Sequence, residues 1–323
     1  RRLMILGLMF ISSSYVAMIF SQTIWDLILY GLLFGLGVSM WRISRHVSII
    51  ELTATSGRGT TMSTLGGLER LGSLVGPILG GFLVAFYGFR SPFGIFAGLA
   101  AGAILFVLVD GTANSKHVQQ KKNTPFGSDL LSVLKLDHRR IGVSCSTAFL
   151  STAARQGRLI LIPLFGSFVL KLPIEQIGVI ITISTIMDFL MFAPAGYIID
   201  NLGRKFAIVP AFIIMGIGIA IIPFTNSFLS LLAACLVIGF GNGIGTGTMM
   251  TLAADLAPKN SPGSFIGLWR TISDIAAFVG SLSVGLLADQ FGFLYSALIL
   301  AIISIISSAS FGLFYDERLQ KSN

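Results

Sequence analysis

Ten long apolar segments constrain this chain more than any other feature of its sequence. A helix that crosses a bilayer needs about 20 mostly apolar residues. Spans are predicted at Leu3–Phe20, Ile24–Ile50, Leu68–Phe86, Pro92–Val109, Ile141–Leu170, Ile177–Ile199, Phe206–Phe224, Phe228–Ala254, Phe265–Leu287 and Leu294–Phe314. The sequence therefore predicts an all-α membrane protein with ten visible transmembrane helices.

The composition excludes several other classes of protein. Hydrophobic residues make up 54% of the 323 residues and charged residues only 11%, against about 25% charged residues in soluble domains. This composition excludes a disordered chain, which would need more polar residues, and also a collagen or a disulfide scaffold. A nucleic-acid-binding protein is excluded because the net charge of +8 is not gathered on one solvated face. Cys145 and Cys235 both lie inside apolar runs, so we expect no disulfide.

One connection is much longer than the others and divides the chain. It predicts a remainder of an N-terminal bundle with four spans at residues 1–110 and a cytoplasmic linker at 111–140. A six-helix C-terminal bundle at 141–316 and a tail at 317–323 follow.

The positive charges predict how the chain is oriented in the membrane. If the long linker is placed on one side, that side holds fifteen Lys and Arg residues and the opposite side two, Arg90 and Lys171, with five more inside spans. This bias predicts a multi-pass protein of the cell membrane, plasma or inner, whose linker and C-terminus are cytoplasmic.

The sequence also repeats itself with an offset of 204 residues. Gly37 then lies over Gly241, and Tyr87-Gly88-Phe89 lies over Phe291-Gly292-Phe293, in one register from about residue 20 to 93. The second copy has two spans before the stretch that matches residue 1. We therefore expect two further spans, roughly 65 residues by this analogy, and twelve in the intact protein. The alternative is a ten-span protein with a processed start.

Two short motifs stand out among the predicted spans. Gly196, Asp200, Gly203, Arg204 and Lys205 form the pattern G-x-x-x-D-x-x-G-R-K at a loop between two spans. The second pattern, G-x-x-x-G-P-x-x-G-G, lies inside one span and consists of Gly72, Gly76, Pro77, Gly80 and Gly81.

With these motifs, the chain resembles the major facilitator superfamily of secondary transporters, and the second motif resembles that of proton-coupled drug and solute antiporters. The resemblance implies two pseudo-symmetric bundles, rocker-switch alternating access and a substrate site near the midplane between the halves. It implies a small-molecule substrate and protons as partners, the lipid bilayer as surroundings, no nucleic acid, no cofactor and a monomer. One departure is that Gly31 stands where the family often has a proton-relay Arg.

Charges inside predicted spans are the strongest pointers to function. Arg155, Gln156 and Arg158 lie midway along one span and Asp188 midway along the next. Arg155 and Asp188 are almost equally far from the hairpin between these helices, so an ion pair between them is predicted. We expect Asp188 to neutralise Arg158 less readily. The unpaired Arg indicates a water-filled cavity or an anionic ligand, and the alternative is a structural pair with one solvated Arg.

A second pair of opposite charges lies on a single predicted helix. Arg270 and Asp274 are spaced i, i+4 and can pair directly. Asp274 lies roughly 14 Å beyond Phe265, near the bilayer centre. Competition between proton, substrate and Arg for this carboxylate would couple transport to protons, and a static pair is the alternative.

The motifs also predict mechanical roles. Gly203 allows a sharp turn, where Asp200 and Arg204 can form a latch, unless the charges serve only as anchors. A smooth face for close helix packing is formed by Gly72, Gly76 and Gly80, and Pro77 permits a kink. This helix could lie where the two halves move against each other, and the alternative is static packing. Gly239, Gly243 and Gly247 form a similar face.

These observations favour a secondary active transporter of small organic solutes, with proton-coupled export as the leading function. Its first rival is an uptake symporter for an organic anion, which the excess of Arg over Asp inside the spans supports. A membrane enzyme is disfavoured because no catalytic triad, P-loop or metal-ligand spacing is present in the sequence. A non-transporting receptor remains as a further alternative.

Overall fold

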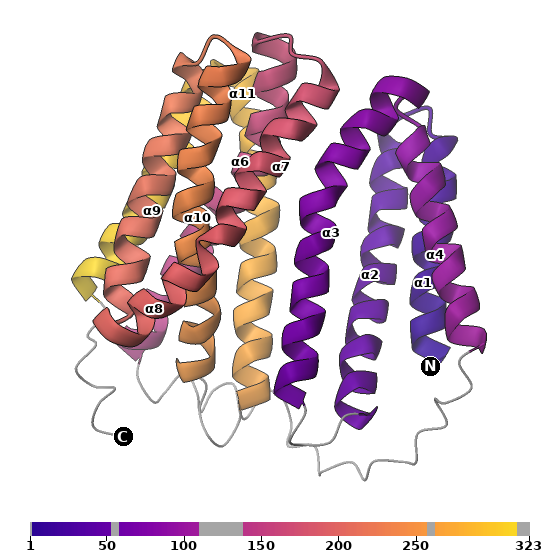
Figure 1. Cartoon of the computed structure of the whole chain (residues 1–323), viewed down its shortest axis with the longest axis horizontal. Coiled ribbons are helices and arrows are strands. Elements are labelled where there is room, and N and C mark those ends of the chain that lie inside the picture. Colours follow the sequence, from indigo (N-terminus) through magenta and orange to yellow (C-terminus); the bar gives the residue numbers. More distant parts are fainter. Residues whose placement is uncertain (1, 53–57, 110–137, 257–261, 315–323) are drawn as a thin grey trace. The chain divides into compact units, whose positions relative to one another are not determined.

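The computed structural model describes residues 2–52, 58–109, 138–256 and 262–314, and its regular elements are helices (Figure 1). They are α1 (Arg2–Ile19), α2 (Ile24–Leu52), α3 (Arg58–Tyr87), α4 (Ser91–Val109), α6 (His138–Leu164), the π-helix η1 (Phe165–Val169), α7 (Ile174–Leu190), α8 (Phe192–Leu202), α9 (Arg204–Ile221), the 3₁₀-helix η2 (Ile222–Phe224), α10 (Phe228–Leu256) and α11 (Pro262–Phe314).

Each of the ten predicted spans coincides with a helical segment, which confirms the predicted fold class. Within the described ranges, seven helical stretches are long and apolar enough to cross a membrane, and one of them, Phe265–Phe314, contains two of the predicted spans. Two helices fall short of that criterion. The apolar part of α3 is only Leu71–Tyr87, and α6 carries the charged side chains discussed below.

One boundary differs from the prediction and one agrees with it. The predicted span Ile177–Ile199 is broken at Met191, which separates α7 from α8. Within α11, two helical limbs meet at Gly292, whose φ of 83° and ψ of 169° are not helical, so the predicted spans Phe265–Leu287 and Leu294–Phe314 lie in separate limbs. Figure 1 shows the two limbs of α11 in different colours, and they run in opposite directions.

The chain forms two compact units, Arg1–Lys121 and Lys122–Asn323, and each is described by itself. In the first unit, α1 packs against α2 and α4, with Leu8, Ile11 and Ala100 buried among them. The Ser12 hydroxyl donates to the carbonyl oxygen of Ala97 across the α1–α4 contact (3.1 Å). On the other side of α2, Arg45 pairs with Glu69 of α3.

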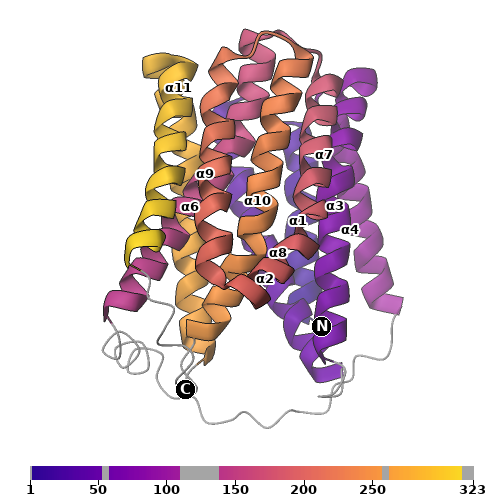
Figure 2. The same ribbon diagram turned by 60° about the vertical axis from the view of Figure 1, so that its left-hand side comes forward.

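In the second unit, α9 lies against α10 and against the second limb of α11, and α6 packs along α11 (Figure 2). The core between them contains Phe212, Met215, Leu231 and Ile238, all fully buried. Serine hydroxyls tie neighbouring helices together by donating to backbone carbonyls. Ser304 donates to Phe212 (2.7 Å), for example, and such bonds satisfy buried hydroxyls without adding charge.

The predicted repeat is present in the backbone geometry of both units. Gly88 and Gly292, which correspond under the offset of 204, have φ values of 82° and 83°, a region that glycine adopts without steric cost. A reciprocal cap lies at the N-terminus of α2. There the Thr23 N–H donates to the Asp26 carboxylate and the Asp26 N–H donates to the Thr23 hydroxyl. The corresponding residues Ser227 and Ser230 form the same cap at α10.

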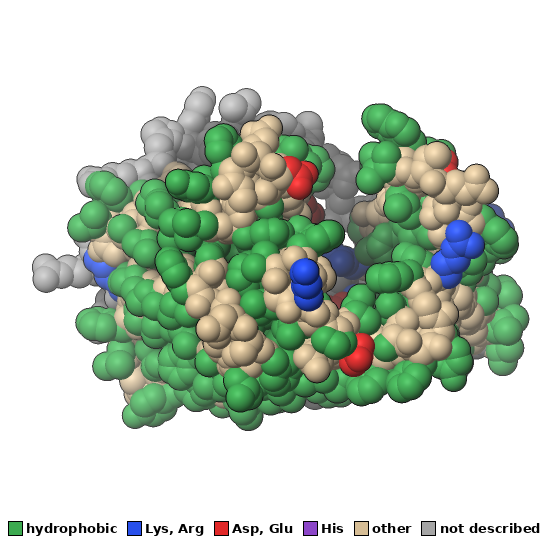
Figure 3. Space-filling model, turned by 90° about the horizontal axis from the view of Figure 1, so that it is seen from above, with side chains coloured by type: hydrophobic (Ala, Val, Ile, Leu, Met, Phe, Trp, Pro, Cys, Tyr) green, Lys and Arg blue, Asp and Glu red, His purple; other side chains and the backbone are tan. Residues whose placement is uncertain are grey.

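The outer surfaces of the helices suit a hydrocarbon environment. Large apolar side chains are widely exposed, including Phe106 (74%) and Phe278 (67%). Figure 3 looks onto one end of the helices, and green apolar side chains surround its rim. Soluble monomers rarely expose such large apolar areas, so this surface agrees with a multi-pass membrane protein.

Candidate functional site

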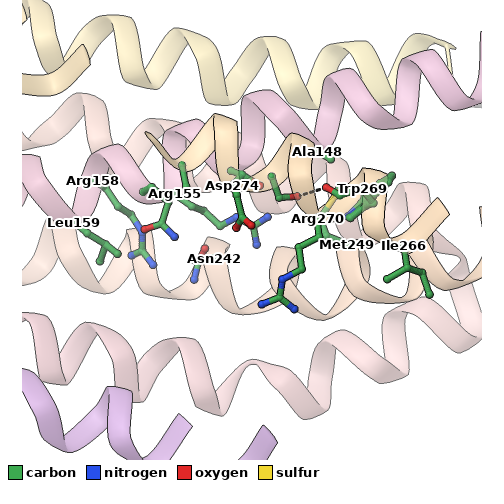
Figure 4. A pocket seen from close by; sticks show the side chains of 14 residues that line it. Ala148, Arg155, Arg158, Leu159, Asn242, Met249, Ile266, Trp269, Arg270 and Asp274 are labelled. Carbon is green, nitrogen blue, oxygen red and sulfur yellow. Dashed lines mark hydrogen bonds between the residues drawn. The ribbon is translucent and has the colours of Figure 1, made fainter. Parts of the chain in front are cut away.

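A cavity of about 570 Å³ lies inside the second unit, where α6, α10 and α11 meet. Its charged and amide-bearing lining residues are Arg155, Gln156, Arg158, Asn242, Arg270 and Asp274. Figure 4 shows the labelled members of this group projecting from three different helices toward a common space. Five of the six residues predicted as substrate or proton-coupling candidates therefore share one cavity.

The cavity is also partly apolar. Ala148 and Leu159 of α6, Met249 of α10, and Ile266, Trp269 and Ala277 of α11 contribute to its lining. An apolar pocket with a few polar groups is the usual form of a site for a small organic molecule, and its volume falls in the usual range. The arrangement suits noncovalent binding of a small organic solute.

Asp188 lies just behind the cavity lining and ties α7 to two other helices. Its Oδ2 atom lies 3.8 Å from Nη2 of Arg158, and the amide of Asn242 donates to the same oxygen. Only 10% of the Arg158 side chain and 20% of the Asp188 side chain are exposed. The carboxylate thus joins α6, α7 and α10 through one charged cluster.

This geometry corrects the predicted pairing. We expected the Asp188 carboxylate to neutralise Arg158 less readily than Arg155, but Arg158 forms the ion pair. Counting residues from the hairpin fixes the depth of the Cα atoms, whereas a long Arg side chain spans a full helical turn. Arg155 instead has its guanidinium carbon 5.8 Å from the ring centroid of Phe212 on α9, a cation–π distance.

Arg270 and Asp274 do not form the ion pair that their spacing predicts. Both side chains are exposed toward the cavity, and no ion pair joins them in the part of the chain that is described. Figure 4 shows the Arg270 guanidinium and the Asp274 side chain at separate places in the cavity. The Arg-before-Asp order is also the weaker one for pairing on a helix.

The position of Asp188 depends on glycines of α10. A Cβ atom at Gly239 would overlap the carbonyl oxygen of Ser184, and one at Gly243 would overlap that of Asp188. The Ser184 hydroxyl also donates to the carbonyl oxygen of Cys235 (2.7 Å). The close packing predicted for this glycine face is confirmed at Gly239 and Gly243. The surroundings of Gly247 lie outside the part of the chain that is described.

Asn242 and Trp269 are site residues that the sequence analysis missed. Asn242 is 5% exposed and bonded to Asp188, and Trp269 contributes an aromatic wall. An amide in an apolar, glycine-rich run was a usable signal for Asn242, because polar groups inside spans are rare. No comparable signal distinguished Trp269 from an ordinary core residue.

The loop motif lies at the junction of α8 and α9. Gly203 has φ 101° and ψ 169° and its N–H donates to the carbonyl oxygen of Ile198 (3.2 Å), which confirms the predicted sharp turn. Arg204 and Lys205 begin α9 directly after it, and Gly196 lies in α8. The Asp200 side chain lies outside the described residues, so the Asp200–Arg204 latch stays a prediction.

The second motif lies within α3, which continues through Pro77. A Cβ atom added at Gly72, Gly76 or Gly80 would meet no other described atom within 4 Å. Under the repeat Gly76 corresponds to Gly280, where an added Cβ would overlap the backbone of Ala153 on α6. No described helix of the first unit takes the place of α6, so the packing role of this face, Gly81 included, stays a prediction.

Comparison with known proteins gives a consistent result. The sequence profile of the Major Facilitator Superfamily matches residues 1–280 and 144–323. An uncharacterized MFS-type transporter of Methanocaldococcus jannaschii is 28% identical over 77% of this chain and 65% of its own length. The synaptic vesicular amine transporter of Mus musculus is 28% identical over 93% of this chain and 57% of its own.

A solved structure shows the same fold. A POT family transporter in complex with 5-aminolevulinic acid superposes with a TM-score of 0.71, covering 96% of this chain and 80% of that one at 14% identity. The chain spans less than two thirds of the two curated relatives. The profile match, the relatives and the fold together establish that this chain belongs to the Major Facilitator Superfamily, a family of transporters and not of enzymes.

Proposed function

We propose that the protein containing this chain is a secondary active transporter of a small organic solute that works by alternating access, coupled to protons and directed toward export. The observation that carries the proposal is the cavity between α6, α10 and α11, which gathers charged side chains inside a surface of apolar helices. Charged groups at membrane depth are costly and mark substrate and proton pathways.

One observation favours export by exchange with protons, because the motif from Gly72 to Gly81 resembles that of proton-coupled antiporters. A relative named as a synaptic vesicular amine transporter supports a small organic solute as the substrate. Asp188 and Asp274 are the carboxylates at the cavity that would carry the proton. The alternative is uptake of an organic anion by symport, which the presence of three lining arginines supports.

The remaining calls form part of the same proposal. We infer a monomer in the plasma or inner membrane whose linker and C-terminus face the cytoplasm, because positively charged loops stay on that side. The charged residues of the loop motif would then stabilise one conformation by pairing at the cytoplasmic end of α8 and α9. These residues are Asp200, Arg204 and Lys205. A salt bridge made in one state and broken in the other biases such a two-state element.

A proton-flux measurement tests the proposal. The product of the complete gene is reconstituted in vesicles that contain a pH dye, a proton gradient is imposed, and cationic, neutral, zwitterionic and anionic solutes are added. We expect proton movement opposite to the solute. Proton movement in the same direction as an anion would establish the symport alternative, and no solute-dependent movement would overturn proton coupling.

Variants assign the coupling carboxylate in the same vesicles. Asp188→Asn or Asp274→Asn is expected to abolish solute-driven proton movement while solute-for-solute exchange persists. Asp289→Asn is the matched control, because Asp289 is an exposed carboxylate of α11 that does not line the cavity. If both cavity variants retain proton movement at the control level, neither carboxylate couples transport.

A further inference from the structure

Arg270 and Asp274 place one positive and one negative charge in the same cavity without a partner from the described part of the protein. Both line the space between α6, α10 and α11, and neither takes part in an ion pair there. They lie on the same helix face, one turn apart. The cavity therefore presents two opposite charges, one helical turn apart, that no described side chain neutralises.

The other charged groups around the cavity are already engaged by the protein. Arg158 pairs with Asp188, and Asp188 also accepts from Asn242. Arg155 lies over the ring of Phe212. Arg270 and Asp274 are therefore the groups left for a ligand, and a ligand that satisfies both carries one charge of each sign.

The apolar lining defines the rest of the ligand. Ile266 and Trp269 lie on the same stretch of α11 as the two charges, and Leu159 and Met249 approach from α6 and α10. A charged head group alone would leave this apolar surface in contact with water. An aliphatic or aromatic body attached to the head group would cover it, and the burial is favourable.

We propose that the cavity binds a zwitterionic solute of the amino-acid type with an apolar body, its carboxylate on Arg270 and its ammonium on Asp274. Arg suits the carboxylate because its guanidinium can donate two parallel hydrogen bonds to the two oxygens. This assignment rests on the proposed function only in taking the cavity as the substrate site. It is independent of the direction of transport, whereas proton coupling through Asp274 would make the proton and the ammonium group compete for one carboxylate.

Three matched compounds test the assignment. Phenylalanine, phenethylamine and phenylpropionate share one apolar body, but the second lacks the carboxylate and the third lacks the ammonium. Binding to the purified complete protein is measured by calorimetry, with leucine and its two analogues as a second set. We expect an amino acid of either set to bind about tenfold more tightly than both of its analogues, because each lost charge-assisted hydrogen bond leaves a protein charge unpaired.

Two variants then separate the two contacts. Arg270→Gln is expected to weaken amino-acid binding about tenfold and to leave the amine unaffected, and Arg270→Lys to restore part of the loss. Asp274→Asn is expected to weaken the amino acid and to leave the acid unaffected. Thr271→Ala is the matched control, since Thr271 neighbours Arg270 but does not line the cavity, and its hydroxyl bonds to Gly267 of its own helix.

Several results would overturn this proposal. Failure of both amino acids to bind is one, and binding of an amine or an acid as tight as that of its amino acid is another. Equal weakening of all three compounds in either variant would assign the pair a structural role. Each of these results can occur while solute-driven proton movement persists in vesicles, so failure of the zwitterion assignment is distinguishable from failure of the transporter proposal.

Discussion

Gly37 and Gly241 make the same helix contact in the two units, 204 residues apart. A Cβ atom at Gly37 would lie 2.8 Å from the oxygen of Gly7 and 2.9 Å from the nitrogen of Ile11 on α1. One at Gly241 would lie 2.6 Å from the oxygen of Ala211 and from the nitrogen of Met215 on α9. All three pairs correspond under the offset, so the repeat extends from the sequence to the packing of individual atoms.

Substitution at these contacts should be destabilising. We expect Gly37→Ala and Gly241→Ala each to lower the free energy of unfolding by about 1–3 kcal/mol, because the added methyl group pushes two backbones apart. Thermal unfolding of the purified protein measures the effect. Gly35→Ala is the control, since its Cβ would meet nothing within 4 Å, and alanine is the better helix former. A lower melting temperature for the control than for Gly37→Ala would contradict this account.

The reciprocal caps predict a second matched pair of effects. Thr23→Ala removes the hydroxyl that accepts from Asp26 N–H, and Ser227→Ala removes its counterpart at α10. Each should cost about 1 kcal/mol of stability, as is usual for loss of an N-terminal cap. Ser13→Ala, which removes an exposed bond within α1, should change the melting temperature much less. Equal effects of all three variants would show that the caps contribute nothing specific.

Most of the fold could be predicted because the long apolar segments and the internal repeat both locate the same helices. The break at Met191 was missed because the residues around it, Phe189 to Phe192, are all apolar and read as one continuous span. Pro194, at the start of α8, was the local signal for this break, since proline lacks an N–H and favours the first turn of a helix. Hydropathy alone does not register such a change of direction.

The charged lining of the candidate cavity could be predicted from the sequence, but the pairing of its charges could not. Arg155, Arg158, Arg270 and Asp274 were found because charge inside a span is costly and therefore rare. Which carboxylate meets which guanidinium depends on side-chain length and direction, as Arg158 shows by reaching Asp188. These directions follow from helix packing, which the linear spacing of residues does not contain.

The turn at Gly203 should tolerate no side chain. Its φ of 101° with ψ of 169° lies in a region that is essentially restricted to glycine. We expect Gly203→Ala to cost about 1–3 kcal/mol, visible as a lower melting temperature and a lower yield of folded protein. Gly196→Ala in the same motif is the control, because it lies within α8 and its Cβ would meet nothing within 4 Å. Equal loss in both variants would place the sensitivity in the motif as a whole rather than in the turn.

The Arg158–Asp188 pair should show strong coupling between its two partners. Removing one partner leaves the other charge buried among helices, so Arg158→Gln and Asp188→Asn should each destabilise the protein by about 3 kcal/mol. The double variant should lose clearly less than the sum of the two single variants, because it leaves neither charge behind. Equilibrium unfolding of all four proteins completes the cycle, and Asp289→Asn reports the effect of removing an exposed carboxylate. Additive losses would mean that the 3.8 Å approach of Arg158 Nη2 to Asp188 Oδ2 carries no stabilising interaction.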